Sequence, residues 1–128
     1  MKYKQLLQLV ANLNAVIGSQ ETKTAKKLVK IYDKVKTHHE SYQAEVEILR
    51  LDNAQTDDKD CLLLDDKGGY KYTKDGIKKL TKDIEALNDK DFEFEIVNVV
   101  NPQGLEDFTF LQDWVTGIEF NKQEEEEL

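Results

Sequence analysis

The hydrophobic residues between positions 3 and 53 recur with the period of an α-helix. A first apolar stripe covers residues 3–17, and Gly18 follows it, where helix C-termini favour glycine. A second stripe steps alternately by four and three residues through Leu28, Tyr32, Val35, His39, Tyr42, Val46 and Leu49. This heptad spacing predicts one long helix over about residues 22–53, because no proline or glycine occurs between Ser19 and Gly68.

The two predicted helices differ greatly in length. The second would be roughly 48 Å long at 1.5 Å per residue. Residues 18–21 form only a short link, so we expect the first helix to fold back on the second as a long antiparallel helical hairpin. The first helix then covers only the N-terminal half of the second. From about His39 onward, the apolar face of the second helix needs another partner.

The rest of the chain shows a different pattern. Residues 56–60 are polar and end the helix, and two short apolar segments, 61–64 and 70–72, flank a glycine pair that suits a β-hairpin turn. Thr73 is the expected N-cap of a third helix that closes at Asn88. The apolar face of this helix comprises Ile77, Leu80, Ile84 and Leu87.

Residues 92–100 alternate apolar and polar side chains and predict a third strand, which could pair with the hairpin. After a turn at residues 101–104, the spacing of Leu105, Phe108, Leu111, Val115 and Ile118 predicts a last short helix. The expected fold class is therefore α+β, mainly α, with the helical hairpin followed by a three-stranded sheet and two shorter helices.

The length of 128 residues suits one domain. Its expected parts are a helical hairpin over residues 1–55 and a small α+β part over residues 56–120 packed on it. Residues 121–128 include the run from Glu124 to Glu127 and are expected to form a disordered acidic tail, because like charges repel.

Charge narrows the range of partners. With 18 basic and 26 acidic residues the net charge is −8, which disfavours nucleic acid as the main ligand. Residues 1–50 nevertheless carry a net charge of +4, whereas residues 51–128 carry −12. No stretch approaches the ~20 apolar residues of a membrane span. The single cysteine, Cys61, precedes three leucines and is expected to be a buried, small hydrophobic side chain.

Five lysines form a basic stripe along one flank of the second predicted helix: Lys23, Lys26, Lys27, Lys30 and Lys34. One interpretation is a solvated helix face. The other is a docking surface for an acidic partner, either the chain's own Glu-rich tail or the acidic half of a neighbouring copy. In the second case the contact would join unlike surfaces, the kind that builds rings or filaments.

Aromatic residues cluster in the C-terminal third, at Phe92, Phe94, Phe108, Phe110, Trp114 and Phe120. Most are expected in the core, but Phe110 and Phe120 fall off the helical stripe. Together with Trp114 they are candidates for anchoring a protein partner, because buried aromatic rings dominate interface energetics. The uncovered half of the long helix adds His39, Tyr42, Val46 and Leu49 as candidate contacts.

No pattern indicates a catalytic or metal site, and no cofactor is expected. His38 and His39 are adjacent and point about 100° apart on a helix, so they cannot grip one metal ion together. The loop acids between Asp52 and Asp66 lack the spacing of a calcium loop. Phosphate-cradling loops and nucleophile motifs do not occur. We therefore expect a non-catalytic protein, although an unrecognised carboxylate pair would make it a small enzyme.

The chain resembles a group of small tailed-bacteriophage proteins that are encoded among virion and tail genes. The resemblance lies in the order of the predicted elements, in the segment Leu64–Thr73 and in the strand rich in phenylalanine and glutamate. The arginine-rich start of the second helix in that group is represented here by Lys23, Lys26 and Lys27. The resemblance implies a virion component or assembly factor that is made in the host cytoplasm. It would act through protein contacts, as an oligomer or as part of a complex with a larger phage structural protein. The alternative is a small acidic regulatory protein that blocks a host enzyme.

Overall fold

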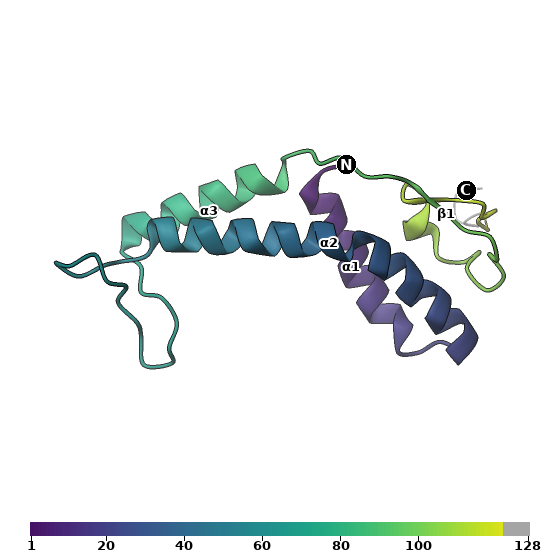
Figure 1. Cartoon of the computed structure of the whole chain (residues 1–128), viewed down its shortest axis with the longest axis horizontal. Coiled ribbons are helices and arrows are strands. Elements are labelled where there is room, and N and C mark those ends of the chain that lie inside the picture. Colours follow the sequence, from purple (N-terminus) through teal and green to yellow (C-terminus); the bar gives the residue numbers. More distant parts are fainter. Residues whose placement is uncertain (122–128) are drawn as a thin grey trace, which may run out of the picture. The chain divides into compact units, whose positions relative to one another are not determined.

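The computed structural model of the chain describes residues 1–121, and residues 122–128, including the expected acidic tail, lie outside the described part. It confirms a mainly helical α+β fold (Figure 1). The elements are α1 (Tyr3–Ile17), α2 (Thr22–Asn53), α3 (Lys74–Asn88), β1 (Val97–Asn98), a 3-10 helix η1 (Thr109–Leu111) and β2 (Val115–Thr116). The bounds of the first three match the predicted helices.

The internal contacts divide the chain into two compact units. Of the described residues, unit 1 comprises Met1, 5–37 and 93–121, and unit 2 comprises 2–4 and 38–92. The division falls inside the continuous helix α2, between Thr37 and His38, instead of near residue 55. Each unit therefore has its own set of buried side chains.

Unit 1 buries the apolar stripe of α1 together with the first part of the heptad stripe of α2. The residues with almost no exposed surface are Leu6, Leu9, Leu13, Leu28, Val35, Leu105 and Leu111. Side chains three and four residues apart share one face of a helix, which explains why the positions on α1 and α2 are buried and why the lysines of α2 are not.

The strands of unit 1 differ from the prediction. Residues 1–121 contain two strands, not three, and β1 pairs in parallel with β2 through Val97 opposite Val115 and Asn98 opposite Thr116. The amide of Val97 donates to the carbonyl of Trp114 at 3.1 Å, and the amide of Val99 donates to that of Thr116 at 2.9 Å. The strand after residue 92 thus pairs with the C-terminal segment of unit 1, not with the expected hairpin.

The prediction of a last helix is also wrong, and the reason lies in the spacing of its apolar residues. Residues 102–114 form consecutive turns, in which the amides of Leu105, Phe108, Leu111 and Trp114 each donate to a carbonyl three residues earlier. Side chains that recur every three residues can therefore be buried without a continuous α-helix. Only η1 is helical here, and β2 replaces the end of the predicted helix.

In unit 2, the C-terminal half of α2 lies beside α3 (Figure 1). The Tyr42 hydroxyl donates to Asn88 Oδ1 at 2.6 Å, and Asn53 Nδ2 donates to Asp83 Oδ2 at 3.1 Å. The residue numbers rise along α2 as they fall along α3, so the two helices run antiparallel. This contact supplies the partner that the second half of the heptad stripe required.

The N-terminus of α3 forms as predicted. Thr73 is extended and its hydroxyl accepts the Gly76 amide at 3.0 Å, which caps the helix. Leu80 and Leu87 are buried, whereas Ile77 at the first turn is 45% exposed.

Residues 54–72 form a loop with isolated antiparallel bridges instead of a regular β-hairpin. Leu64 pairs with Tyr70 around a turn in which Asp65 Oδ1 accepts the amides of Lys67 and Gly69. The glycine pair therefore marks the turn as predicted. The thiol of Cys61 is exposed, contrary to the prediction, because the segment lies outside the helix pair that forms the core of unit 2.

Candidate binding cleft

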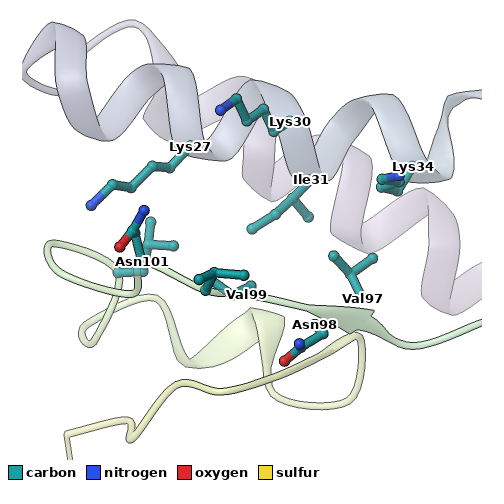
Figure 2. Close-up of a pocket in the computed structure, with 10 residues that line it drawn as sticks. Lys27, Lys30, Ile31, Lys34, Val97, Asn98, Val99 and Asn101 are labelled. Atoms are coloured by element: carbon teal, nitrogen blue, oxygen red, sulfur yellow. The ribbon is translucent and has the colours of Figure 1, made fainter.

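Unit 1 contains a cleft of about 290 Å³ between the N-terminal half of α2 and the segment that begins with β1 (Figure 2). Its lining is mostly apolar, with cationic groups along one side. The lining residues are Lys27, Lys30, Ile31, Lys34, Val97, Asn98, Val99, Val100, Asn101 and Leu105. We call this feature the basic cleft.

Helix α2 provides one wall of the basic cleft. Lys27, Lys30 and Lys34 are separated by three and four residues, a spacing that places side chains on one face of an α-helix. Ile31 lies between them and is only 3% exposed. Ile31, which is not part of the heptad stripe, therefore forms the apolar part of this wall, and the lysines beside it supply the charge.

The opposite wall is an extended segment held by β2. Val97 and Val99 face Ile31 across the cleft (Figure 2), and both are fixed by the backbone hydrogen bonds to residues 114 and 116. Leu105 is fully buried, whereas Val100 at the rim is 81% exposed. An exposed apolar side chain beside a cationic rim suits a ligand that carries both acidic and apolar groups.

Lys27 closes one end of the basic cleft. Its ammonium group donates to the carbonyl of Gln103 at 2.7 Å. Gly104 adopts a φ of +90°, and a Cβ at this position would lie 2.8 Å from the hydroxyl oxygen of Thr24. Glycine is favoured here because side chains with a Cβ rarely adopt this φ and because a Cβ would force the Thr24 side chain to shift.

No acidic residue in the lining of the basic cleft neutralises the charge of its lysines. None of its ten lining residues is acidic. Among the described residues no ion pair involves Lys30 or Lys34, and Lys30 directs its ammonium group away from the opposite wall (Figure 2). A neighbouring hollow shares Lys27 and Asn101 with the cleft and continues the surface; its other lining residues are Glu21, Lys23, Thr24, Gln103 and Gly104. Its volume is about 510 Å³.

The structure thus brings together part of the predicted basic stripe. Lys27, Lys30 and Lys34 line the cleft, and Lys23 lines the adjoining hollow. Lys26 is exposed on α2 and lines neither of them. The opposite wall, residues 97–101 and Leu105, was not expected at this site. Its alternating pattern indicated a strand, but nothing in the sequence showed which helix the strand would face.

The candidate contacts on the second half of α2 are mostly covered by the chain itself. Tyr42 and Val46 are each 8% exposed, so the prediction that they wait for an external partner is wrong. His39 is half-buried, and Leu49 is half-buried beside Ile48 in a shallow apolar groove between α2 and α3. Periodicity defined this face correctly but did not show that α3 would cover it.

The aromatic candidates are also largely packed inside unit 1. Trp114 is 4% exposed and lies edge-on to Phe94, with ring centroids 4.9 Å apart, so it is a core residue instead of an exposed anchor. Phe110 packs against Phe108 at 5.9 Å and, with Trp114, lines a shallow hollow beside α1. Phe120 is half-buried.

Four side chains of unit 2 have shifted pKa values. Lys4 and Lys79 donate hydrogen bonds to Asp89 and Asp83, respectively, and lower the pKa of each carboxyl group below 3.8. Burial raises the pKa of Tyr42 above 10.0. A hydrogen bond from the Tyr70 hydroxyl to Glu47 raises the pKa of Tyr70, because ionisation would remove the bond and place two negative charges together.

Within residues 1–121, no group of three histidine, cysteine or acidic side chains converges in a way that could hold a metal ion. In the same part of the chain, no helix combines the length and the apolar character needed to cross a membrane. The residues that the structure describes thus form a small α+β protein with a cationic, partly apolar cleft. Comparison with protein-family models, curated proteins and solved structures finds no match to the chain.

Proposed function

We propose that this chain is a non-catalytic protein-binding component, and that its basic cleft receives an acidic segment of a protein partner. The observation that carries this proposal is that Lys27, Lys30 and Lys34 line one partly apolar cleft, with no acidic side chain in the lining. Such a surface attracts carboxylates through charge and holds neighbouring apolar side chains through burial.

Binding fits the lining better than catalysis does. The lining contains no serine, cysteine, histidine, aspartate or glutamate, the residues that most often act as nucleophiles or general acids and bases. An extended nucleic acid is a poorer ligand than an acidic peptide. Three lysines offer a short basic surface, and the net charge of −8 repels phosphates outside it.

The arrangement of α1 is part of the same proposal. The four residues 18–21 between α1 and α2 favour an antiparallel hairpin, in which the buried stripe of α1 packs against Leu28 and Val35. This packing would stiffen the N-terminal half of α2, so that the lysines are presented from a rigid helix.

The biological setting we propose is a phage particle. The segment Leu64–Thr73 and the order of elements support a virion or tail component, or an assembly factor, that acts in the host cytoplasm or in the virion. In this setting the partner of the basic cleft would be another copy of the chain or a larger phage structural protein.

The binding test uses a fluorescein-labelled peptide of four glutamates followed by leucine and phenylalanine. We expect it to bind the full chain and to bind the double variant Lys30→Ala, Lys34→Ala roughly ten-fold more weakly, since each lost charge pair is worth up to about 1 kcal/mol. Fluorescence anisotropy at low salt measures the affinity, which should fall as salt is added.

The matched control is Lys78→Ala, Lys82→Ala, which removes two exposed lysines of α3 in unit 2 and leaves the net charge equal to that of the cleft variant. It should bind the peptide like the original chain. Equal loss in both variants would mean that the peptide responds to net charge alone, and no binding to any of the three proteins would refute the proposed function.

A further inference from the structure

The sequence holds an acidic segment of its own shortly after the last described residue. Glu124–Glu127 follow three residues after Asn121, the last described residue, in a segment that also contains Lys122 and Leu128. Four consecutive carboxylates next to a leucine have the composition that the basic cleft suits: acidic groups for its rim and an apolar group for its floor.

The last described residue is fixed beside the cleft. The Asn121 amide donates to the carbonyl of Glu106 at 2.9 Å, and its side chain donates to Asp107 Oδ1 at 2.6 Å. Glu106 directly follows Leu105, which lines the cleft. The chain therefore leaves the described part of unit 1 next to the end of the cleft that Gln103 and Lys27 close.

The two carboxylates nearest this exit are already engaged. Glu106 accepts a hydrogen bond from the Gly104 amide at 3.0 Å, and Asp107 accepts the one from Asn121. Neither residue lines the cleft. They consequently leave the three lysines unneutralised.

The length of the acidic segment also matches the length of the row of lysines in the basic cleft. Lys27 and Lys34 are seven residues apart on α2, a separation of roughly 10 Å along the helix axis. Three residues after Asn121 can span roughly 10 Å when extended, and four glutamates can span about another 10 Å, which equals the length of the lysine row. A segment that starts at the Lys27 end can thus place its carboxylates along the whole row of lysines.

We propose that residues 124–127 bind intramolecularly in the basic cleft and compete with the acidic segment of a partner. The inference rests on the proposed function, because it names the regulation of the same site. A tether of a few residues gives the internal segment an effective concentration in the millimolar range, so even a weak contact is populated. A partner must displace it, which restricts binding to partners with a stronger acidic segment.

The first experiment measures where the segment lies. A nitroxide is attached at Leu128→Cys in a Cys61→Ser background, and amide signals of the ¹⁵N-labelled chain are recorded. We expect broadening at Lys34 and Val97, at the end of the cleft far from Asn121, and loss of that broadening when all four glutamates are replaced by glutamine. The glutamine variant keeps the tether, so it separates docking from simple proximity.

A mixed sample distinguishes binding of the chain's own acidic segment from binding of the acidic segment of a second copy. In an equal mixture of ¹⁵N-labelled chain without nitroxide and unlabelled chain with nitroxide, only contacts between molecules broaden signals. We expect none at Lys34 or Val97. Broadening that occurs in this mixture would overturn the intramolecular proposal, as would equal broadening in the native and glutamine forms.

The second experiment repeats the peptide titration of the proposed function with the glutamine variant. Removing the internal competitor should tighten peptide binding roughly three- to ten-fold, given a millimolar effective concentration. The control is Asp52→Asn, Asp58→Asn, Asp66→Asn, Glu85→Gln, which neutralises four exposed acids of unit 2 and should tighten binding less.

The two proposals fail in different ways. If the peptide binds the native chain and the glutamine variant equally, the internal competition is refuted and the cleft remains a binding site. If the peptide binds neither form, the proposed function itself is refuted.

Discussion

At the scale of single residues, a few positions determine whether the basic cleft can form. Gly104 and Gly117 adopt positive φ angles of +90° and +93°, a region that side chains with a Cβ rarely occupy. Gly104 lets the turn approach Thr24, and Gly117 lets the end of β2 approach the carbonyl of Val99. Both glycines thus act on the wall of the cleft opposite the lysines.

Replacing Gly117 with alanine should lower the free energy of unfolding by about 2–3 kcal/mol, because the new Cβ would clash with the Val99 carbonyl and the φ is strained. Urea unfolding followed by circular dichroism measures the loss. Gly18→Ala is the matched control, since a Cβ there has open space within 4 Å. Comparable losses in both variants would contradict the role of Gly117.

The ionisation of Asp83 gives a second prediction at this scale. Lys79 Nζ lies 2.8 Å from its carboxylate, and Asn53 adds a second donor, so its pKa in the folded chain should lie below 3.8. Folding therefore favours the charged form of the Asp83 carboxyl group. The resulting stabilisation is present above the unfolded pKa of about 3.9 and is lost as the pH falls through the lower, folded value.

Carbon-detected NMR titration of the Asp83 carboxyl group measures this pKa. In Lys79→Met the pKa should rise toward 3.8, because the largest cause of the shift is removed. In Lys78→Met, which removes an exposed lysine one position earlier, it should stay low. A pKa at or above 3.8 in the original chain would contradict the assignment.

At the scale of elements, the pairing of α3 with the second half of α2 organises unit 2. Their polar contacts run from Tyr42 with Asn88 at one end to Asn53 with Asp83 at the other. Lys90 adds an ion pair with Glu45 at 3.3 Å. On the same two helices, Val46, Leu80 and Leu87 are buried. The apolar burial supplies most of the stability, since exposed ion pairs contribute little.

Leu87→Ala should therefore lower the free energy of unfolding by about 2–4 kcal/mol, the usual cost of truncating a buried leucine. Ile77→Ala on the same helix, where the side chain is 45% exposed, should cost less than about 1 kcal/mol. Denaturant unfolding of both variants tests the difference. A large loss from Ile77→Ala would instead show that this side chain is covered in solution.

At the scale of the whole molecule, the uneven distribution of charge is the main feature. Residues 51–128 are strongly acidic, yet the basic cleft keeps three lysines together on an apolar floor. Opposite charges within one chain can meet intramolecularly or in another copy. The short tether from Asn121 favours the intramolecular contact, and the mixed nitroxide sample separates the two cases.

The three helices, the cap at Thr73 and the turn at Gly68 could be predicted from the sequence, because each depends on local periodicity or on a single residue's backbone preference. The basic stripe could be predicted for the same reason: its lysines lie on one face of one helix. The exposed thiol of Cys61 could not be predicted from its leucine neighbours, since exposure depends on what packs over a segment.

Only the tertiary structure decided which faces meet. It placed α3 over Tyr42 and Val46, paired β1 with β2, and set the strand wall opposite Lys27, Lys30 and Lys34. The amino-acid pattern by itself determined where helices lie and which of their faces are apolar or charged. The physical reason is that backbone hydrogen bonding repeats over three to four residues, whereas the choice among apolar surfaces depends on contacts between residues far apart in sequence.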